Sequence, residues 1–368
     1  MERSDYLIQA ITNTAPSFLK GAIDLTARNY FILSWVLEHG RVLTNASGYD
    51  LNWNVTAREP EIHTTRGQRQ EFVASDTEEQ LTINHAKLRG SEVLDEDTLL
   101  VNDGQAAIVK LADRKVKGLA DSMCRRMNGQ FYNDDQIDPN GCTGLLSLFR
   151  PLVGAATDLM AVPQVGSTYG GRAMHLGALG GRWDANLGPA RKNTAILEDW
   201  PDGSGDSEFD YLSPKMFNYS GSWSTGTNNW QTNCEKVLRR SCLYIDHLGG
   251  KGAAPMLALM GPSLAAELRD KLEEKDRLRP SDYADKVGLP GRLLEYEDMV
   301  ISTDFHCPTD RAYCINSEMM ELYTLTPDLF WLDGPEWSIR DEAYLMALKF
   351  KGNFRWKPKY FSELGSYS

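Results

Sequence analysis

The stretch DGQAAIVKLADRKVKGLADSMCRRMNGQF, residues 103–131, carries the clearest helical pattern in this chain. Apolar residues recur in it at spacings of three and four, which places them on one face of a helix. The residues of this face are Ile108, Ala112, Val116, Leu119, Met123 and Met127. Asn102 or Asp103 is a suitable N-cap. The pattern therefore predicts a helix about 40 Å long, at ~1.5 Å per residue, with one buried face.

Strand periodicity appears on the N-terminal side of this helix. In YDLNWNVT, residues 49–56, apolar and polar side chains alternate strictly, so that one face of a strand is apolar. A weaker alternation follows in QLTINHAKL, residues 80–88. Between them lies REPEIHTTRGQRQEF, residues 58–72, which is rich in charged side chains. Together these features predict a long hairpin with a charged tip.

The composition limits the class of protein. The chain has 368 residues, of which 42% are hydrophobic, and this suffices for more than one domain. Its net charge of −12 disfavours tight binding to nucleic acid or to anionic membranes, because both rest on Lys and Arg. No apolar run approaches the ~20 residues of a spanning helix, and the N-terminal residues do not resemble a signal peptide. We expect a protein that folds in the cytoplasm, with its six scattered cysteines free.

The remaining sequence predicts a mixed α/β region followed by strands. Helices are expected at about 230–248 and from Pro262 to about 275, with a short strand, APMLALM, at 254–260 between them. Further strands are expected at 293–302, 311–316, 320–325 and 344–356, the last of these being the final strand. A short helix at about 27–38 precedes the hairpin, and residues 1–27 are expected to be an extended arm. The chain as a whole is predicted to be α+β.

Motifs that would indicate catalysis are absent from the sequence. It contains no G-x-S-x-G, no HExxH and no P-loop. The run NDDQIDPNGCTG, residues 133–144, resembles a calcium loop, but Gln136 and Ser147 stand where the first and last ligands belong. We therefore expect no catalytic, cofactor-binding or metal site. An acidic α/β hydrolase stays open as an alternative, because catalytic groups are sometimes assembled from distant positions.

The order of these elements resembles that of the major capsid proteins of tailed bacteriophages, which have the HK97 fold. The resemblance extends over nearly the whole chain, and the order of the motifs carries it more than any single motif does. The matching segments are residues 39–55, the helix at 103–131, GLLSLF at 144–149, TYGG at 168–171, residues 229–272, and RAYCINSEMMELYTL at 311–325. One departure follows TYGG. The family pattern continues with an apolar residue and an Asp-Arg pair, whereas this chain has Arg172, Ala173 and Met174.

The resemblance implies an HK97-like capsid fold in five segments. They are an N-terminal arm at 1–44, an extended hairpin called the E-loop at 45–92, a peripheral or P domain with the long spine helix at 93–140, an inserted axial or A domain at 141–294, and return strands of the P domain with the C-terminus at 295–368.

The resemblance also suggests what the hairpin does. An isolated two-stranded ribbon is only marginally stable, so it needs a surface to lie on. We expect that surface to be a neighbouring subunit, with the apolar face of the ribbon buried there and its charged tip setting register and partner choice. The expected interface residues are Tyr49, Leu51, Trp53 and Val55 on the apolar face, and Arg58, Glu59, Arg66, Arg69 and Glu71 at the tip.

In function, the resemblance implies a structural protein that is not an enzyme and uses no cofactor. Copies would assemble into hexamers and pentamers of an icosahedral capsid that encloses double-stranded DNA without sequence-specific binding. The implied partners are other copies of the chain, a separate scaffolding protein, a portal and decoration proteins, with no membrane. The implied location is the virion, and the host cytoplasm during assembly. A compartment of the encapsulin type, which encloses cargo enzymes, is an alternative that the sequence does not separate from a capsid.

Overall fold

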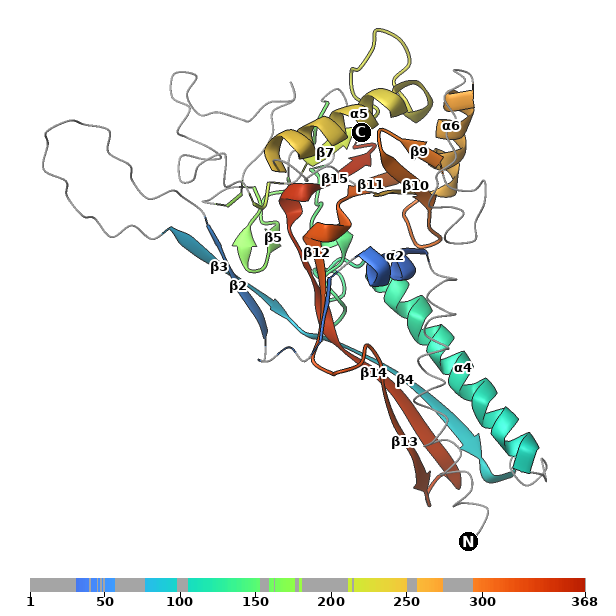
Figure 1. The fold of residues 1–368 in the computed structure, drawn as a ribbon. Coiled ribbons are helices and arrows are strands. Elements are labelled where there is room, and N and C mark those ends of the chain that lie inside the picture. The colour runs from blue at the N-terminus through green and yellow to red at the C-terminus, as the bar shows by residue number, and fades with distance from the viewer. Residues whose placement is uncertain are drawn as a thin grey trace, which may run out of the picture. The chain divides into compact units, whose positions relative to one another are not determined.

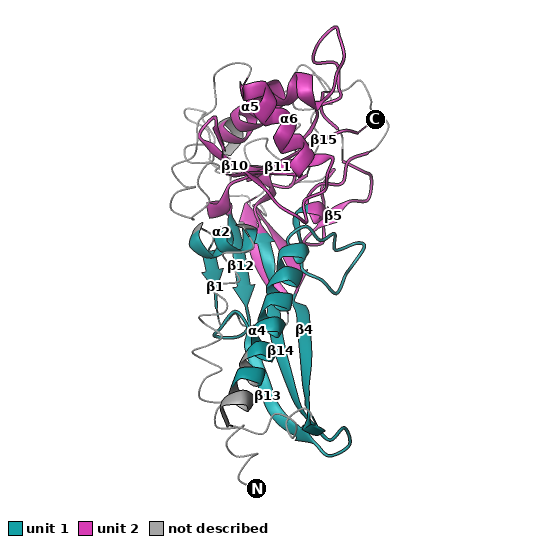
Figure 2. Ribbon diagram, turned by 90° about the vertical axis from the view of Figure 1, so that its right-hand side faces the viewer, with its two compact units in different colours: residues 1–49, 85–145, 320–355 teal, residues 50–84, 146–319, 356–368 magenta. Residues whose placement is uncertain are grey.

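The computed structural model describes residues 31–39, 41–44, 46, 48, 50–56, 77–97, 105–152, 159–161, 163–175, 179–180, 211–213, 215–249, 257–273 and 294–367. These residues form the predicted α+β structure. The chain divides into two compact units, coloured separately in Figure 2: unit 1 comprises residues 1–49, 85–145 and 320–355, and unit 2 comprises residues 50–84, 146–319 and 356–368.

Unit 1 is a sheet with a long helix on one face (Figures 1 and 2). Its strands run in the order β1-β12-β14-β13, and β4 pairs with the other edge of β14, so that β14 is the central strand. The elements are α2 (Phe31–His39), β1 (Arg41–Leu43), β4 (Ala86–Asp95), α4 (Gln105–Gln130), β12 (Met320–Thr324), β13 (Trp331–Ser338) and β14 (Ala343–Trp356).

The predicted spine helix is α4, and the predicted stripe is its buried face. Val116, Leu119, Met123 and Met127 are all at most 6% exposed. The helix lies against β4, where a Cβ atom on Gly90 would stand 2.8 Å from Cδ1 of Leu119. A glycine at this strand position thus makes room for the leucine. The side chains of Ile108 and Ala112, the first two members of the stripe, lie outside the described side chains.

Unit 2 contains a six-stranded sheet in the order β7-β15-β11-β8-β10-β9. The pairs β7–β15 and β8–β10 are parallel, and the other pairs are antiparallel. The elements are β7 (Lys215–Asn218), α5 (Trp230–Gly249), β8 (Leu257–Met260), α6 (Pro262–Glu273), β9 (Leu294–Tyr296), β10 (Met299–Thr303), β11 (Arg311–Ile315) and β15 (Phe361–Gly365). The described residues also form short 3-10 helices at η1 (Leu145–Ser147), which begins at the last residue of a unit 1 segment, and in unit 2 at η3 (Ser317–Met319) and η4 (Pro358–Tyr360).

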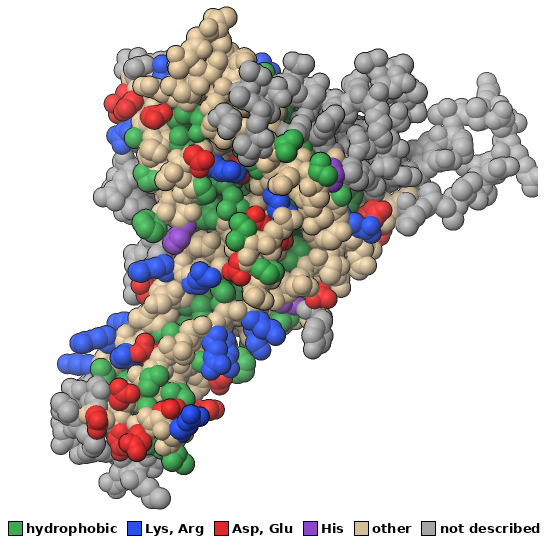
Figure 3. Space-filling view, turned by 180° about the vertical axis from the view of Figure 1, so that it is seen from behind, with side chains coloured by type: hydrophobic (Ala, Val, Ile, Leu, Met, Phe, Trp, Pro, Cys, Tyr) green, Lys and Arg blue, Asp and Glu red, His purple; other side chains and the backbone are tan. Residues whose placement is uncertain are grey.

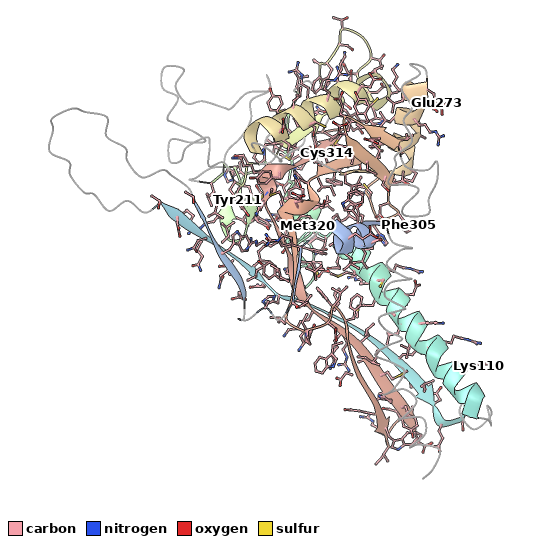
Figure 4. All side chains as sticks on the ribbon, in the orientation of Figure 1. Lys110, Tyr211, Glu273, Phe305, Cys314 and Met320 are labelled. Carbon is pink, nitrogen blue, oxygen red and sulfur yellow. The ribbon has the colours of Figure 1, made fainter. Side chains whose placement is uncertain are left out.

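Helices α5 and α6 supply the apolar core on this sheet. Val237 and Leu238 of α5 and Leu268 of α6 are fully buried with strand residues such as Cys314 of β11, which is labelled in Figure 4. The predicted order of helix, strand and helix over residues 230–275 is therefore confirmed as α5, β8 and α6. The prediction that 344–356 is the final strand is wrong, because β15 follows it and lies between β7 and β11.

Two small antiparallel pairs complete unit 2. They are the ribbon of β2 (Asp50–Thr56) with β3 (Glu78–Asn84), and the short hairpin of β5 (Thr168–Tyr169) with β6 (Arg172–Ala173). The predicted short helix at 27–38 is described as α2 from Phe31 onward, and the expected extended arm at 1–27 lies outside the described residues. Among the helices that the structure describes, none is long and apolar enough to cross a membrane.

We expect Leu119→Asp to prevent folding of unit 1. The substitution places a charge without a partner against β4, at a cost of ~3 kcal/mol or more. Ser122→Asp is the matched control, because it makes the same change of charge at an exposed position of the same helix. The soluble fraction after expression and thermal melting by circular dichroism measure the effect. Soluble Leu119→Asp protein that melts like Ser122→Asp would show that the stripe is not core.

Candidate functional site: the ribbon and its anchor

The two arms of the predicted hairpin form a regular antiparallel ribbon. Seven residue pairs join β2 to β3, from Asp50 opposite Asn84 to Thr56 opposite Glu78. Tyr49 and residues 57–76 lie outside the described residues. The predicted interface residues Arg58, Glu59, Arg66, Arg69 and Glu71 are among them, so their role stays a prediction.

The apolar face of the ribbon is largely covered by its own chain. Leu51, Leu81 and Ile83 are 7%, 0% and 6% exposed. Leu51 is thus mostly buried already in the single chain, while its predicted contact with a neighbouring subunit stays a prediction. Trp53 and Val55 are half-buried, and their predicted contact with another subunit stays a prediction. Sequence reasoning found no segment that would cover this face, but β5 and β6 provide one.

The hairpin of β5 and β6 is the segment that holds the ribbon. Its strands are joined by Gly170 and Gly171, whose φ angles are +58° and +78°. Two successive residues with positive φ define the two-residue turn that suits the twist of a hairpin, and glycine adopts it without steric cost. The TYGG motif is thus a tight turn, and the chain continues after it as β6.

The turn binds the edge of β3 through backbone and side-chain groups. The amide of Thr82 donates to the carbonyl of Gly170 at 3.0 Å. Nε of Arg172 donates to the carbonyl of Gln80 at 3.1 Å, and Nη2 of Arg172 lies 2.6 Å from Oε2 of Glu79. Arg172, which stands where the family pattern has an apolar residue, is therefore one of the residues that anchor the ribbon.

Apolar packing completes this contact. A Cβ atom on Gly170 would stand 2.8 Å from Cβ of Leu81, so the glycine backbone lies directly against that side chain. The rings of Trp53 and Tyr169 are 6.2 Å apart between centroids and tilted by 60°. This separation is within the range of favourable aromatic pairs. The ribbon is consequently packed against the hairpin of β5 and β6 as well as hydrogen-bonded to it.

Tyr169 connects this anchor to the start of the C-terminal segment of unit 2. Its hydroxyl accepts a hydrogen bond from the amide of Trp356 at 2.8 Å and donates to the carbonyl of the same residue at 3.2 Å. The hydroxyl of Tyr211, labelled in Figure 4, also donates to this carbonyl at 3.0 Å. Nη1 of Arg150 donates to the carbonyl of Thr168 at 2.8 Å. The anchor is thus part of the folded core of unit 2.

A buried carboxyl group in unit 2 is the clearest perturbed titratable site. Glu363 of β15 is 0% exposed, with Nη1 of Arg311 at 2.5 Å and the hydroxyl of Tyr367 donating to it at 2.9 Å. Burial raises the pKa of Glu363 to about 7, although the charge of Arg311 opposes this. Burial also raises the pKa of Tyr313 and of Tyr367 well above the usual range. Because the carboxyl is sealed from solvent, the cluster is a structural one.

The described residues also bear on metal and thiol chemistry. They contain no group of three or more His, Cys, Asp or Glu side chains that would hold a metal ion. The six cysteines are free, as predicted, and five of them are buried. Burial raises the pKa of Cys142 to about 12 and that of Cys314 to about 11, so these thiols stay protonated at neutral pH.

Comparison with known proteins gives a match in fold but not in sequence. No family model matches the chain, and no curated protein does. Among solved structures, the capsid of an empty GTA particle is similar with a TM-score of 0.53 and 10% identity, over 90% of this chain and 89% of the other. The capsid of a native GTA particle is similar with a TM-score of 0.51 and 11% identity, over 90% of both chains. The capsid of cyanophage A-1(L) is similar with a TM-score of 0.51 and 12% identity, over 90% of this chain and 92% of the other.

These similarities define the fold of the chain. They cover about nine-tenths of its length, and each of the three structures is a capsid. The chain therefore has the HK97-type capsid fold, and the fold predicted from its sequence is confirmed. At 10–12% identity this likeness establishes the architecture, while the role of the protein rests on further reasoning.

We expect Gly170→Ala to destabilise unit 2 more than Gly171→Ala does. Both residues have positive φ, which costs alanine ~1–2 kcal/mol. Only at Gly170 does the new methyl group also meet Leu81, whereas at Gly171 nothing lies within 4 Å. The melting temperatures of the two variants measure the difference. Equal melting would show that the turn does not pack tightly on β3.

The buried carboxyl predicts a dependence of stability on pH. Between about pH 4.5 and pH 7 the folded protein keeps a proton on Glu363 that the unfolded chain has released. The free energy of unfolding should therefore fall with rising pH across this window, by about 3 kcal/mol at most, and level off above it. Glu363→Gln should lose this dependence, because the amide cannot ionise.

Denaturant unfolding at a series of pH values measures this effect as the difference between wild type and Glu363→Gln. Glu318→Gln is the control, since that side chain is exposed. Parallel pH profiles for wild type and Glu363→Gln would show that the carboxyl does not titrate in this window.

Proposed function

We propose that this protein is the major subunit of an icosahedral capsid. Many copies assemble into hexamers and pentamers, and the closed shell encloses double-stranded DNA. The observation that carries the proposal is the capsid fold over about nine-tenths of the chain, shared with shells of phage and phage-like particles. The protein acts in the virion as a structural component and catalyses no reaction.

Within this proposal the two units take the roles of the family's domains. Unit 1, with its spine helix α4, supports assignment as the P domain, and the six-stranded sheet of unit 2 supports assignment as the A domain. The A domain would then include β10, β11 and β15, which lie in the segment 295–368 that the sequence assigned to the P domain. The ribbon of β2 and β3 is the base of the E-loop. Trp53 and Val55 are its half-buried apolar residues, and their contact with a neighbouring subunit is part of this proposal.

The overall charge supports enclosure of DNA without adhesion to it. A net charge of −12 repels phosphate on average, so that a packaged genome remains free to enter and leave. We further propose that assembly uses a separate scaffolding protein and a portal, with decoration proteins on the finished shell, and that it takes place in the host cytoplasm.

Electron microscopy of the purified protein tests the proposal. We expect closed shells after expression of the chain alone or with its scaffolding protein. Nuclease-protected DNA in particles from infected cells supports a capsid, whereas an enclosed enzyme would indicate the encapsulin-type alternative. A stable monomer at micromolar concentration in sedimentation velocity, under conditions that permit assembly, would overturn both. Hydrolase activity of such a monomer would then support the alternative of an acidic α/β hydrolase.

We expect reversal of Arg66 and Arg69 to Glu to reduce assembly without unfolding the subunit. Exposed substitutions change stability by only ~0.5 kcal/mol, whereas a weakened contact recurs in every subunit of a closed shell. The measurements are melting by circular dichroism and particle yield on a sucrose gradient. The matched control reverses Arg240 and Arg269, which are exposed on α5 and α6. Wild-type yield from the Arg66/Arg69 variant would show that this tip makes no contact between subunits.

A further inference from the structure

The ribbon of β2 and β3 has one edge that the described residues leave open. At the outer edge of β3, the amide of Thr82 donates to the carbonyl of Gly170 in the turn between β5 and β6. β2 pairs with β3 and with no other described strand. Figure 1 shows the two strands of the ribbon side by side, with β5 near them. The outer edge of β2, from Asp50 to Thr56, is therefore an open strand edge of seven residues.

The contacts of β3 show which backbone groups of β2 lie on this open edge. The amide of Thr82 and the carbonyl of Gln80 are bonded to the hairpin of β5 and β6, so they point away from β2. In an antiparallel pair, the residues opposite them also point their amide and carbonyl groups away from the partner strand. These residues are Asn52, opposite Thr82, and Asn54, opposite Gln80. Their outward amide and carbonyl groups form no hydrogen bond with any described residue.

This edge lacks the features that usually keep open strand edges from pairing, which are short length, lysine, proline or a bulge. The edge strand β13 contains Pro335 and a shift of register, β4 carries Lys87 and Arg89, and β9 has three residues. Figure 3 shows several Lys and Arg side chains in the lower half of the view, the part of the molecule to which β4 belongs. β2 has none of these features, and its seven residues pair with β3 in one unbroken register. Its open edge is therefore suited to accept another strand.

The side chains of β2 indicate what kind of strand fits this edge. On the apolar face, Leu51 is buried, while Trp53 and Val55 are only half-buried. On the opposite face, Asn52 and Asn54 are exposed and uncharged. A strand beside β2 must bring apolar side chains to the first face and small polar side chains to the second. β2 itself has this alternation.

We propose that β2 pairs antiparallel with β2 of a second copy of this chain, about a two-fold axis that passes through the sheet at Trp53. Trp53 then lies opposite its own equivalent. Leu51 of each copy lies opposite Val55 of the other, and Asn52 lies opposite Asn54. All seven residues of both strands overlap only in this register.

The backbone satisfies this register as well as the side chains do. Asn52 and Asn54 both point their amide and carbonyl groups outward, so opposite each other they form hydrogen-bonded pairs. Asp50 and Thr56 have the same parity along the strand and pair in the same way. The two Trp53 residues form a non-hydrogen-bonded pair, in which side chains approach most closely and aromatic residues stabilise a sheet. The result is a sheet of four strands in place of a ribbon of two, which is marginal alone.

The fixed end of the ribbon is compatible with this contact. The hairpin of β5 and β6 holds the ribbon at the edge of β3, so it does not block the edge of β2. The axis is perpendicular to the sheet, and the apolar faces of the two ribbons therefore lie on the same side. Val55, half-buried in the single chain, gains Leu51 of the other copy as an apolar neighbour.

A second copy is a better occupant of this edge than a strand from another protein. The register is complementary to itself in both side chains and backbone, and an isologous contact of this kind is typical of two-fold symmetry. A shell also holds many copies of the chain close together. The inference rests on the proposed function, because it names one contact between subunits of the shell.

A disulfide at the axis tests the contact directly. In a non-hydrogen-bonded pair the Cα atoms are ~4.5 Å apart, which a disulfide spans. Trp53→Cys subunits should therefore join into dimers under mild oxidation. Val55→Cys is the matched control, because it lies on the same face but about 13 Å from its equivalent, too far for a disulfide. Non-reducing gel electrophoresis measures the dimers, with wild type as the baseline for the six native cysteines.

Charges on the opposite face test the register without removal of an apolar residue. Asn52→Glu with Asn54→Lys sets opposite charges across the axis at two places, whereas Asn52→Lys with Asn54→Lys sets like charges there. We expect the first variant to self-associate at least as tightly as wild type, and the second about tenfold more weakly than the first. Sedimentation velocity measures association, and melting by circular dichroism confirms that each variant is folded.

The outcomes separate this contact from the proposed function. Equal dimer formation by Trp53→Cys and Val55→Cys, or none by either, would overturn the inference, and so would equal association of the two charge variants. Loss of another protein from particles of the two-lysine variant, at unchanged self-association, would assign the edge to that protein instead. Trp53→Cys dimers from a chain that forms no shells would support the contact and contradict the proposed function. Shells that form normally while the contact tests fail would contradict the contact alone.

Discussion

Unit 1 depends on one packing constraint, the contact of α4 with the strands beside it. The helix presents a single apolar stripe, and β4 meets it with a glycine at the point where Leu119 needs space. The same strand register that turns Gly90 toward the helix turns Lys87, Arg89 and Val93 away from it. The composition of the opposite face of β4 is thus fixed by the core beneath the strand, because a shift by one residue would exchange the two faces. The exposed face of the sheet and the core beneath it are in this way specified by the same alternation.

The ribbon follows a different principle. Its base is held by its own unit through the turn at Gly170 and Gly171, the ion pair of Arg172 with Glu79, and the packing of Tyr169 on Trp53. In the proposed shell, such a fixed base would favour docking of the ribbon on a neighbouring subunit, because less conformational entropy would then be lost. The ion pair is partly exposed and contributes little alone. The backbone bond to Thr82 and the fit of Leu81 against glycine supply the more rigid part of the anchor.

Strong periodicity made much of the fold predictable. The apolar stripe of α4 and the alternation in β2 predicted a helix and a strand correctly, because many consecutive residues repeat one pattern. β13 and β15 were missed: β13 contains Gly334 and Pro335, which interrupt a strand pattern, and β15 has only five residues. The anchor was missed for another reason. TYGG was recognised, but neither Arg172 nor Leu81 carries a signal for a contact that joins segments about ninety residues apart in sequence.

The place of β15 in its sheet affects when the six-stranded sheet of unit 2 can form during synthesis. β15 comes after every other strand of the six-stranded sheet in chain order, yet it lies inside the sheet between β7 and β11. Until residues 361–365 leave the ribosome, β7 lacks β15 beside it and keeps only its bridge from Phe217 to Met160, and one edge of β11 is open. Domains generally fold as units as the chain emerges, so unit 2 can close only after β15 has emerged. A nascent chain that lacks this five-residue strand leaves the sheet of unit 2 divided between β7 and β11.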